Sequence, residues 1–112
     1  MKRNPKLYLG DRVESIDAIN GYINNFTEDD FFQDTQAQDA VIRRLEVIGE
    51  AVKNLDEEFR QSYPKIPWKS MAGMRDLLIH EYFGVDLHRI WLTIKRDLPA
   101  IEGMMKEILK TL

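Results

Sequence analysis

Residues 36–60 decide the fold, and they read QAQDAVIRRLEVIGEAVKNLDEEFR. Their apolar residues recur at steps of four and three without interruption, which is the spacing of one face of an amphipathic helix. These residues are Val41, Leu45, Ile48, Val52, Leu55 and Phe59. A regular seven-residue period favours helices that pack nearly parallel, at a crossing angle of about +20°. The stretch therefore predicts a long helix within a helical bundle.

Two residues at the edge of this apolar face bear on the site. Gly49 has no side chain, so it could let the backbone of another helix approach closely. Glu50 falls on the polar side of the predicted helix together with Arg43, Glu46 and Lys53. We interpret Glu50 as part of a solvated face.

A second amphipathic helix is predicted on the N-terminal side, over residues 5–26. Its apolar stripe is Leu9, Val13, Ile16, Ile19, Ile23 and Phe26. Between residues 27 and 36 the pattern lapses, and Thr27 with Asp30 resembles a capping box that uses Asp in place of Glu. We expect a short helical turn or a loop there.

Two further helices are predicted on the C-terminal side. Pro64 and Pro67 interrupt the helical pattern, and Pro67 suits the first turn of a new helix from residue 67 or 68 to between residues 80 and 83, with Gly84 as its stop. Asp86 is a plausible N-cap for the last helix. Pro99 lies inside that helix, so we expect a kink or two end-to-end segments that meet near Asp97. The fold class is therefore all-α, an up-and-down bundle of four to five helices, with residues 1–112 as a single domain.

Composition excludes several classes of protein. The chain has 112 residues, no cysteine, two histidines and a formal charge of −3, with 44% hydrophobic residues. It has no disulfides or thiolate nucleophiles, and its two histidines, His80 and His88, form no metal-ligand pattern. Net negative charge argues against a protein that coats nucleic acid, although a local basic cleft stays compatible with it. No apolar run is long enough to span a bilayer and no signal segment is visible, so we expect a cytoplasmic protein.

The candidate chemistry lies in residues 74–82, which read MRDLLIHEY. They bring a cation, a carboxylate, an imidazole and a phenol together in an otherwise apolar run: Arg75, Asp76, His80 and Tyr82. Histidine is the side chain whose ordinary pKa suits proton transfer near neutral pH. We expect His88, by contrast, to be a surface residue.

A helical count divides these residues between two faces. At about 100° per residue, Asp76 and His80 share the face opposite the core, one turn apart, so a carboxylate–imidazole contact is sterically easy. Arg75 and Tyr82 lie well over 100° from His80 by the same count. Arg75 could reach around on its long stem, the helix could unwind before Tyr82, or a second copy could complete the site across a two-fold axis. The local pattern alone is equally consistent with a structural role for these residues.

The ordered set of motifs resembles the HEPN superfamily, in particular the HepT-like toxins. The central motif is Arg75-x4-His80-x-Tyr82. It is accompanied, in the same order, by Ile48-Gly49-Glu50-Ala51, Ile66-Pro67-Trp68, Gly73-Met74-Arg75-Asp76, Val85-Asp86, Trp91 and Asp97-Leu98-Pro99. The resemblance covers nearly the whole domain from residue 36 onward.

The resemblance implies a function and partners. Such toxins are helical homodimers whose two motifs line a shared cleft and act as metal-independent endoribonucleases, with no cofactor. Arg75 and His80 would be catalytic, and Asp76 and Tyr82 supporting. The partner would be a minimal nucleotidyltransferase antitoxin that neutralises the toxin by transferring AMP to Tyr82. Asp76 departs from the family pattern, where an amide or another polar residue is frequent.

The residue types suit RNA cleavage without a metal. His80 could take the proton of the 2′-hydroxyl or give one to the leaving oxygen. Arg75 could stabilise the negative charge of a phosphorane-like transition state, and Tyr82 could position the phosphate. The alternative is a non-catalytic dimeric helical subunit that binds or regulates a nucleotidyltransferase, which the net negative charge favours.

Overall fold

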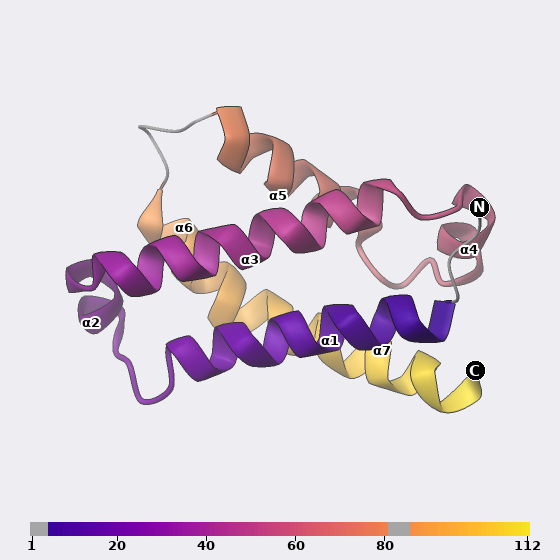
Figure 1. Cartoon of the computed structure of the whole chain (residues 1–112), viewed down its shortest axis with the longest axis horizontal. Coiled ribbons are helices and arrows are strands. Elements are labelled where there is room, and N and C mark those ends of the chain that lie inside the picture. Colours follow the sequence, from indigo (N-terminus) through magenta and orange to yellow (C-terminus); the bar gives the residue numbers. More distant parts are fainter. Residues whose placement is uncertain (1–4, 81–85) are drawn as a thin grey trace.

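A computed structural model of the chain describes residues 5–80 and 86–112. The long helices are α1 (Pro5–Tyr22), α3 (Thr35–Lys53), α5 (Trp68–His80) and α7 (Leu98–Thr111). The shorter segments are α2 (Glu28–Gln33), α4 (Glu57–Ser62), α6 (Leu87–Leu92) and the π-helical turn η1 (Thr93–Asp97). The long helices run alternately up and down, so the predicted all-α up-and-down bundle is confirmed (Figure 1).

Helix α3 lies at the centre of the bundle. It separates α5 on one side from α1 and α7 on the other, and α1 packs against both α3 and α7 (Figure 1). The core is mostly aliphatic, and the stripe that the sequence predicts for α3 supplies Val41, Leu45, Ile48 and Val52, all at most 4% exposed. Among the described helices, α5 makes its extensive contacts with α3 alone. Among the α5 residues whose burial is described, Lys69, Ser70 and Gly73 are exposed.

The predicted helix over residues 36–60 is two helices, so that boundary is wrong. α3 ends at Lys53, and α4 begins at Glu57. The Asn54 side chain donates to the Glu50 carbonyl at 3.2 Å, and the Leu55 N–H bonds the Val52 carbonyl at 3.1 Å, a three-residue step that tightens and ends the helix. Phe59 still reaches the core, because its ring packs 6.1 Å from the ring of Trp68.

The first helix also ends earlier than predicted, at Tyr22 instead of Phe26. Asn25 follows it in the left-handed conformation with φ 64°, which an α-helix cannot continue through. The capping box is confirmed: the Asp30 N–H donates to Thr27 Oγ1 at 3.1 Å, and the Thr27 N–H donates to Asp30 Oδ2 at 2.9 Å. These bonds start α2.

Pro99 is accommodated by a wide turn instead of a break. The Leu98 N–H donates to the Thr93 carbonyl, five residues back, so η1 contains one residue more per turn than an α-helix. The segment ends at Asp97, where the sequence predicts the change, and Pro99 then lies in the first turn of α7, where its missing N–H is tolerated. Asp86 is the N-cap of α6, as predicted, and accepts from the His88 N–H at 3.0 Å.

His88 is exposed, as predicted, but it is also an ion-pair partner. Its Nδ1 contacts the Glu28 carboxylate, which joins α6 to α2. That hydrogen bond raises the pKa of His88 above its ordinary value. The folded state therefore binds the proton more tightly than the unfolded state, so the pair stabilises the fold at acidic pH and loses this contribution as the pH rises through the raised pKa.

Several predictions concern residues outside the described ranges. Tyr82 and the stop at Gly84 lie outside them. The backbone of His80 is described as the last residue of α5, but its side chain is not. Within residues 5–80 and 86–112, no helix is both long and apolar enough to cross a membrane.

Candidate functional site

Helix α5, which carries the candidate residues, is fixed at its first residue. Trp68 is 6% exposed, and its indole N–H donates to the carbonyls of Arg60 at 3.1 Å and Tyr63 at 3.0 Å. These two carbonyls belong to the end of α4 and its cap, so they tie the start of α5 to the preceding turn. The direction in which α5 leaves α4 is therefore set before the motif begins.

Gly49 brings α5 into close contact with α3. A Cβ atom at Gly49 would lie 2.8 Å from the Met71 carbonyl oxygen and 3.3 Å from Arg75 Cα, and it would overlap Arg75 Cβ. Any other residue at position 49 would push the two helices apart. The expectation that Gly49 permits a close approach is confirmed, and the backbone that approaches is that of α5 at Met71 and Arg75.

The close crossing assembles a cluster of four charged side chains. Arg75 Nε lies 2.8 Å from Glu50 Oε2, and Arg75 Nη1 lies 3.0 Å from Asp76 Oδ1. The same Asp76 oxygen accepts from Lys53 Nζ at 2.7 Å. We call Glu50, Lys53, Arg75 and Asp76 the charge cluster. Glu50 and Lys53 come from α3, and Arg75 and Asp76 come from α5.

Glu50 lies on a solvated face, as predicted, but it also takes part in the site. Its side chain is 53% exposed, as a solvated residue would be, but its carboxylate holds the guanidinium of Arg75. Neither Glu50 nor Lys53 is assigned to the site by the sequence. Lys53 lies one turn after Gly49 on the same face of α3, whereas Glu50 is about 100° away around the helix, so their spacing from Gly49 does not identify the residues of α5 that they contact.

The separation of Arg75 from Asp76 on the helical count is bridged by the arginine stem. The Arg75 side chain is 26% exposed, and its guanidinium reaches both carboxylates from the seam between α3 and α5. The predicted contact between Asp76 and His80 stays a prediction, because the structure does not describe the His80 side chain. His80 ends α5 one turn after Asp76.

The charge cluster is formally neutral, with two cations and two carboxylates. The hydrogen bond from Lys53, followed by that from Arg75, lowers the pKa of Asp76 below its ordinary value. Asp76 is thus ionised at neutral pH. Because the pKa is lower in the folded state, the stabilisation it provides is present above the ordinary Asp pKa and disappears as the pH falls through the lowered value.

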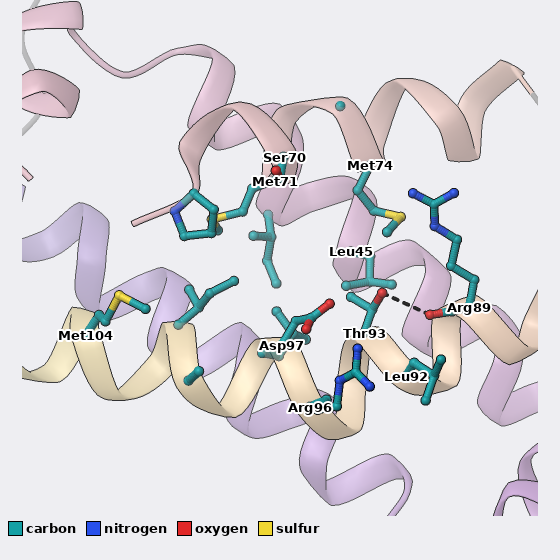
Figure 2. Close-up of a pocket in the computed structure, with 16 residues that line it drawn as sticks. Leu45, Ser70, Met71, Met74, Arg89, Leu92, Thr93, Arg96, Asp97 and Met104 are labelled. Atoms are coloured by element: carbon teal, nitrogen blue, oxygen red, sulfur yellow. Dashed lines mark hydrogen bonds between the residues drawn. The ribbon is translucent and has the colours of Figure 1, made fainter. Parts of the chain in front are cut away.

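A groove runs along the other flank of α5, opposite the charge cluster. It has a volume of ≈ 860 Å³, and α3, α5, α6, η1 and α7 line it. Leu45, Met71 and Met74 contribute apolar surface, whereas Arg89, Arg96 and Asp97 are exposed at its edge (Figure 2). Within the described part of the chain, none of these three charged side chains has an ion-pair partner.

The structure combines an all-helical domain with an arginine that is held against a neighbouring helix. This arginine, Arg75, precedes His80 by five residues. The family model for HepT-like ribonucleases matches residues 13–108. The chain belongs to the HepT-like ribonuclease family.

Individual relatives agree with this assignment. A protein of Thermococcus cleftensis named as a probable ribonuclease HepT is 46% identical over 110 residues, covering 98% of this chain and 100% of the relative. A Caldanaerobacter subterraneus protein provisionally named as an RNase is 44% identical over 108 residues, covering 96% of each chain. No solved structure matches the chain.

A third relative is longer than this chain. A Methanocaldococcus jannaschii protein, named as a gamma-glutamylcyclotransferase and, provisionally, as an RNase, is 52% identical over 112 residues. The alignment covers the whole of this chain but only 50% of that relative. In all three names the ribonuclease activity is given provisionally.

Proposed function

We propose that this protein is a metal-independent endoribonuclease and the toxin component of a toxin–antitoxin system, with Arg75 and His80 as its catalytic residues. The observation that carries the proposal is the placement of Arg75 within a HepT-like chain. Gly49 allows α5 to pack closely against α3, and Glu50 pairs with Nε of the Arg75 guanidinium. The Arg75 side chain is still 26% exposed to solvent. A permanently charged, planar donor is thereby held at the surface, where a phosphate can approach it.

The proposed step is an internal phosphoryl transfer. The 2′-hydroxyl oxygen of a ribose attacks the adjacent phosphorus, the bond to the 5′-oxygen breaks, and the products are a 2′,3′-cyclic phosphate and a free 5′-hydroxyl. His80 transfers one of the two protons that must move, from the attacking oxygen or to the leaving oxygen. Arg75 stabilises the negative charge that gathers on the phosphoryl oxygens, and Tyr82 positions the phosphate.

The test is cleavage of single-stranded RNA in the presence of EDTA. We expect the wild-type chain to cut the RNA and leave a cyclic phosphate, and His80→Ala to lower the rate about 10²- to 10⁴-fold, the usual contribution of a general acid or base. Circular dichroism checks that the variant is folded. Cleavage that needs a divalent metal and is indifferent to His80→Ala would contradict the proposal.

The first proposed partner is another copy of this chain, so that the active form is a homodimer. An apolar groove, lined on α5 in part by the exposed Ser70 and Gly73, offers a surface that an oligomer interface could use. Arg89, Arg96 and Asp97 give its edge both signs of charge, and none of the three has an ion-pair partner among residues 5–80 and 86–112. In a two-fold interface the same patch meets itself, so Arg89 or Arg96 of one copy can pair with Asp97 of the other.

The second proposed partner is a minimal nucleotidyltransferase that acts as antitoxin. In the proposed reaction the Tyr82 phenolic oxygen attacks the α-phosphorus of ATP, pyrophosphate leaves, and the phenolic proton passes to solvent. The attached AMP adds bulk and negative charge to a site that must accept phosphate, which would stop cleavage.

Native mass spectrometry after co-expression with such a nucleotidyltransferase tests both partners. We expect a homodimer, with each chain heavier by one AMP, and no added mass on Tyr82→Phe. A monomer would contradict the first partner. The same AMP shift on Tyr82→Phe would place the modification elsewhere.

A specific observation favours a second candidate function, a non-catalytic subunit that binds and regulates a nucleotidyltransferase. The charge cluster is neutral and the whole chain carries a formal charge of −3, which is poor attraction for RNA. Expression of the protein alone discriminates the two. Growth arrest that His80→Ala relieves supports the nuclease, whereas normal growth supports the regulatory subunit.

A further inference from the structure

Lys53 is the residue of the charge cluster for which the family motif provides no role. It lies in the last turn of α3, and its ammonium group contacts the same Asp76 oxygen that accepts from Arg75 Nη1. The two cations come from different helices, yet they converge on one point. Their side chains are 39% and 26% exposed, so this point is accessible from solvent.

A single oxygen bound by two cations resembles the environment that a phosphate oxygen needs. If a phosphate oxygen took the place of Asp76 Oδ1, it would meet Lys53 Nζ and Arg75 Nη1 at hydrogen-bonding distance. Lysine and arginine are the side chains that bind phosphate, the first as a point charge and the second through a planar fork. The carboxylate of Asp76 thus occupies a position that suits the substrate.

Glu50 keeps Arg75 in place during such an exchange. It pairs with Nε, so Nη1 becomes available to another anion once Asp76 turns away. The two carboxylates that pair with Arg75 therefore have different roles. Glu50 positions the guanidinium, and Asp76 neutralises the cationic atoms that a phosphate would use.

We propose that Lys53 is a second phosphate-binding residue of the RNA site and that Asp76 is an internal counter-ion, which Lys53 and Arg75 exchange for an RNA phosphate. The proposal rests on the ribonuclease function proposed above. It predicts opposite effects for two neighbouring residues: removing the charge of Lys53 weakens RNA binding, and removing the charge of Asp76 strengthens it.

The experiment measures binding of a short fluorescein-labelled single-stranded RNA by fluorescence anisotropy at several salt concentrations. His80→Ala is the background, so that the probe stays intact. Adding Lys53→Met should raise Kd about tenfold, the loss expected for one charged hydrogen bond to phosphate. The slope of log K against log salt should become shallower by about 0.7, as for one fewer phosphate contact on a single strand.

Further variants separate charge from structure. Lys53→Arg should restore most of the affinity, since it restores the cation. Asp76→Asn keeps the size of the side chain and should lower Kd several-fold. Lys110→Met is the matched control, because Lys110 is also an exposed lysine paired with a carboxylate, Glu107 at 3.1 Å, but on α7. It should leave both Kd and the salt slope unchanged.

The outcomes distinguish the two proposals. An unchanged Kd and salt slope for Lys53→Met, in a protein that binds RNA, would overturn the role of Lys53. Weaker binding by Asp76→Asn would overturn its role as a competing counter-ion. If the wild-type chain cuts no RNA and the His80→Ala chain binds none, the proposed function itself fails, and the role of Lys53 fails with it.

Discussion

Replacing Arg75 by lysine is expected to lower the rate of RNA cleavage about 10²- to 10³-fold, as for the loss of one transition-state donor, although the formal charge of the site is unchanged. The reason is geometric. Arg75 binds Glu50 through Nε and reaches Asp76 through Nη1 at the same time. A lysine has a single nitrogen, so it must choose between its anchor and the phosphate.

The control for this prediction is Arg43→Lys. Arg43 is also an arginine paired with a glutamate, Glu46 at 3.9 Å, but its side chain is 75% exposed on α3. We expect Arg43→Lys to leave kcat/KM and thermal unfolding unchanged. The measurement is kcat/KM for a labelled RNA. Wild-type kcat/KM in Arg75→Lys would show that Arg75 serves only to join α5 to α3.

The second large effect is expected from Gly49→Ala. The added methyl group would overlap Arg75 Cβ and lie 2.8 Å from the Met71 carbonyl oxygen, both of which belong to a helix and cannot move alone. We expect the free energy of unfolding to fall by about 1 to 3 kcal/mol, the usual cost of overpacking. RNA cleavage should fall as well, because α5 must shift and carry Arg75 away from Glu50.

Gly103→Ala provides a control of opposite sign. Gly103 is an exposed residue inside α7, and a Cβ there would meet nothing within 4 Å. The substitution should raise the free energy of unfolding by about 0.5 to 1 kcal/mol, since alanine favours the helix. Urea unfolding measures both variants. Equal stability of Gly49→Ala and the wild-type chain would contradict the close crossing of α3 and α5.

Features that depend on local chemistry could be predicted from the sequence. The capping box of Thr27 and Asp30, the N-cap at Asp86 and the change at Asp97 each involve residues within a few positions of one another, so their geometry follows from spacing alone. The end of α3 could not be predicted, because the apolar stripe continues past it through Leu55 and Phe59. Both residues stay against the core although the helix has ended.

In the site, too, some residues could be predicted from the sequence and others could not. The motif identifies Arg75 and Asp76, but not the partners they find on another helix. Those partners depend on where two helices cross, and a helical count of one helix contains no information about that register. Gly49 marks a close approach without saying which residue approaches. The pairing of Glu50 and Lys53 with residues of α5 depends on how α5 lies against α3.

The wide turn of η1 has a consequence for comparing lengths within the family. Ile90, Ile94 and Leu98 are spaced by four residues and are all buried. The π-turn keeps them on one side of the helix, because it accommodates one extra residue. A relative that lacks one residue between positions 93 and 97 could form an uninterrupted α-helix. Because the π-turn in this chain already accommodates that residue without a change of face, the residues after the gap would keep the faces that they have here. An alignment gap at this point would therefore indicate a relative in which a plain α-helix replaces the wide turn, with the same side of α7 facing α1.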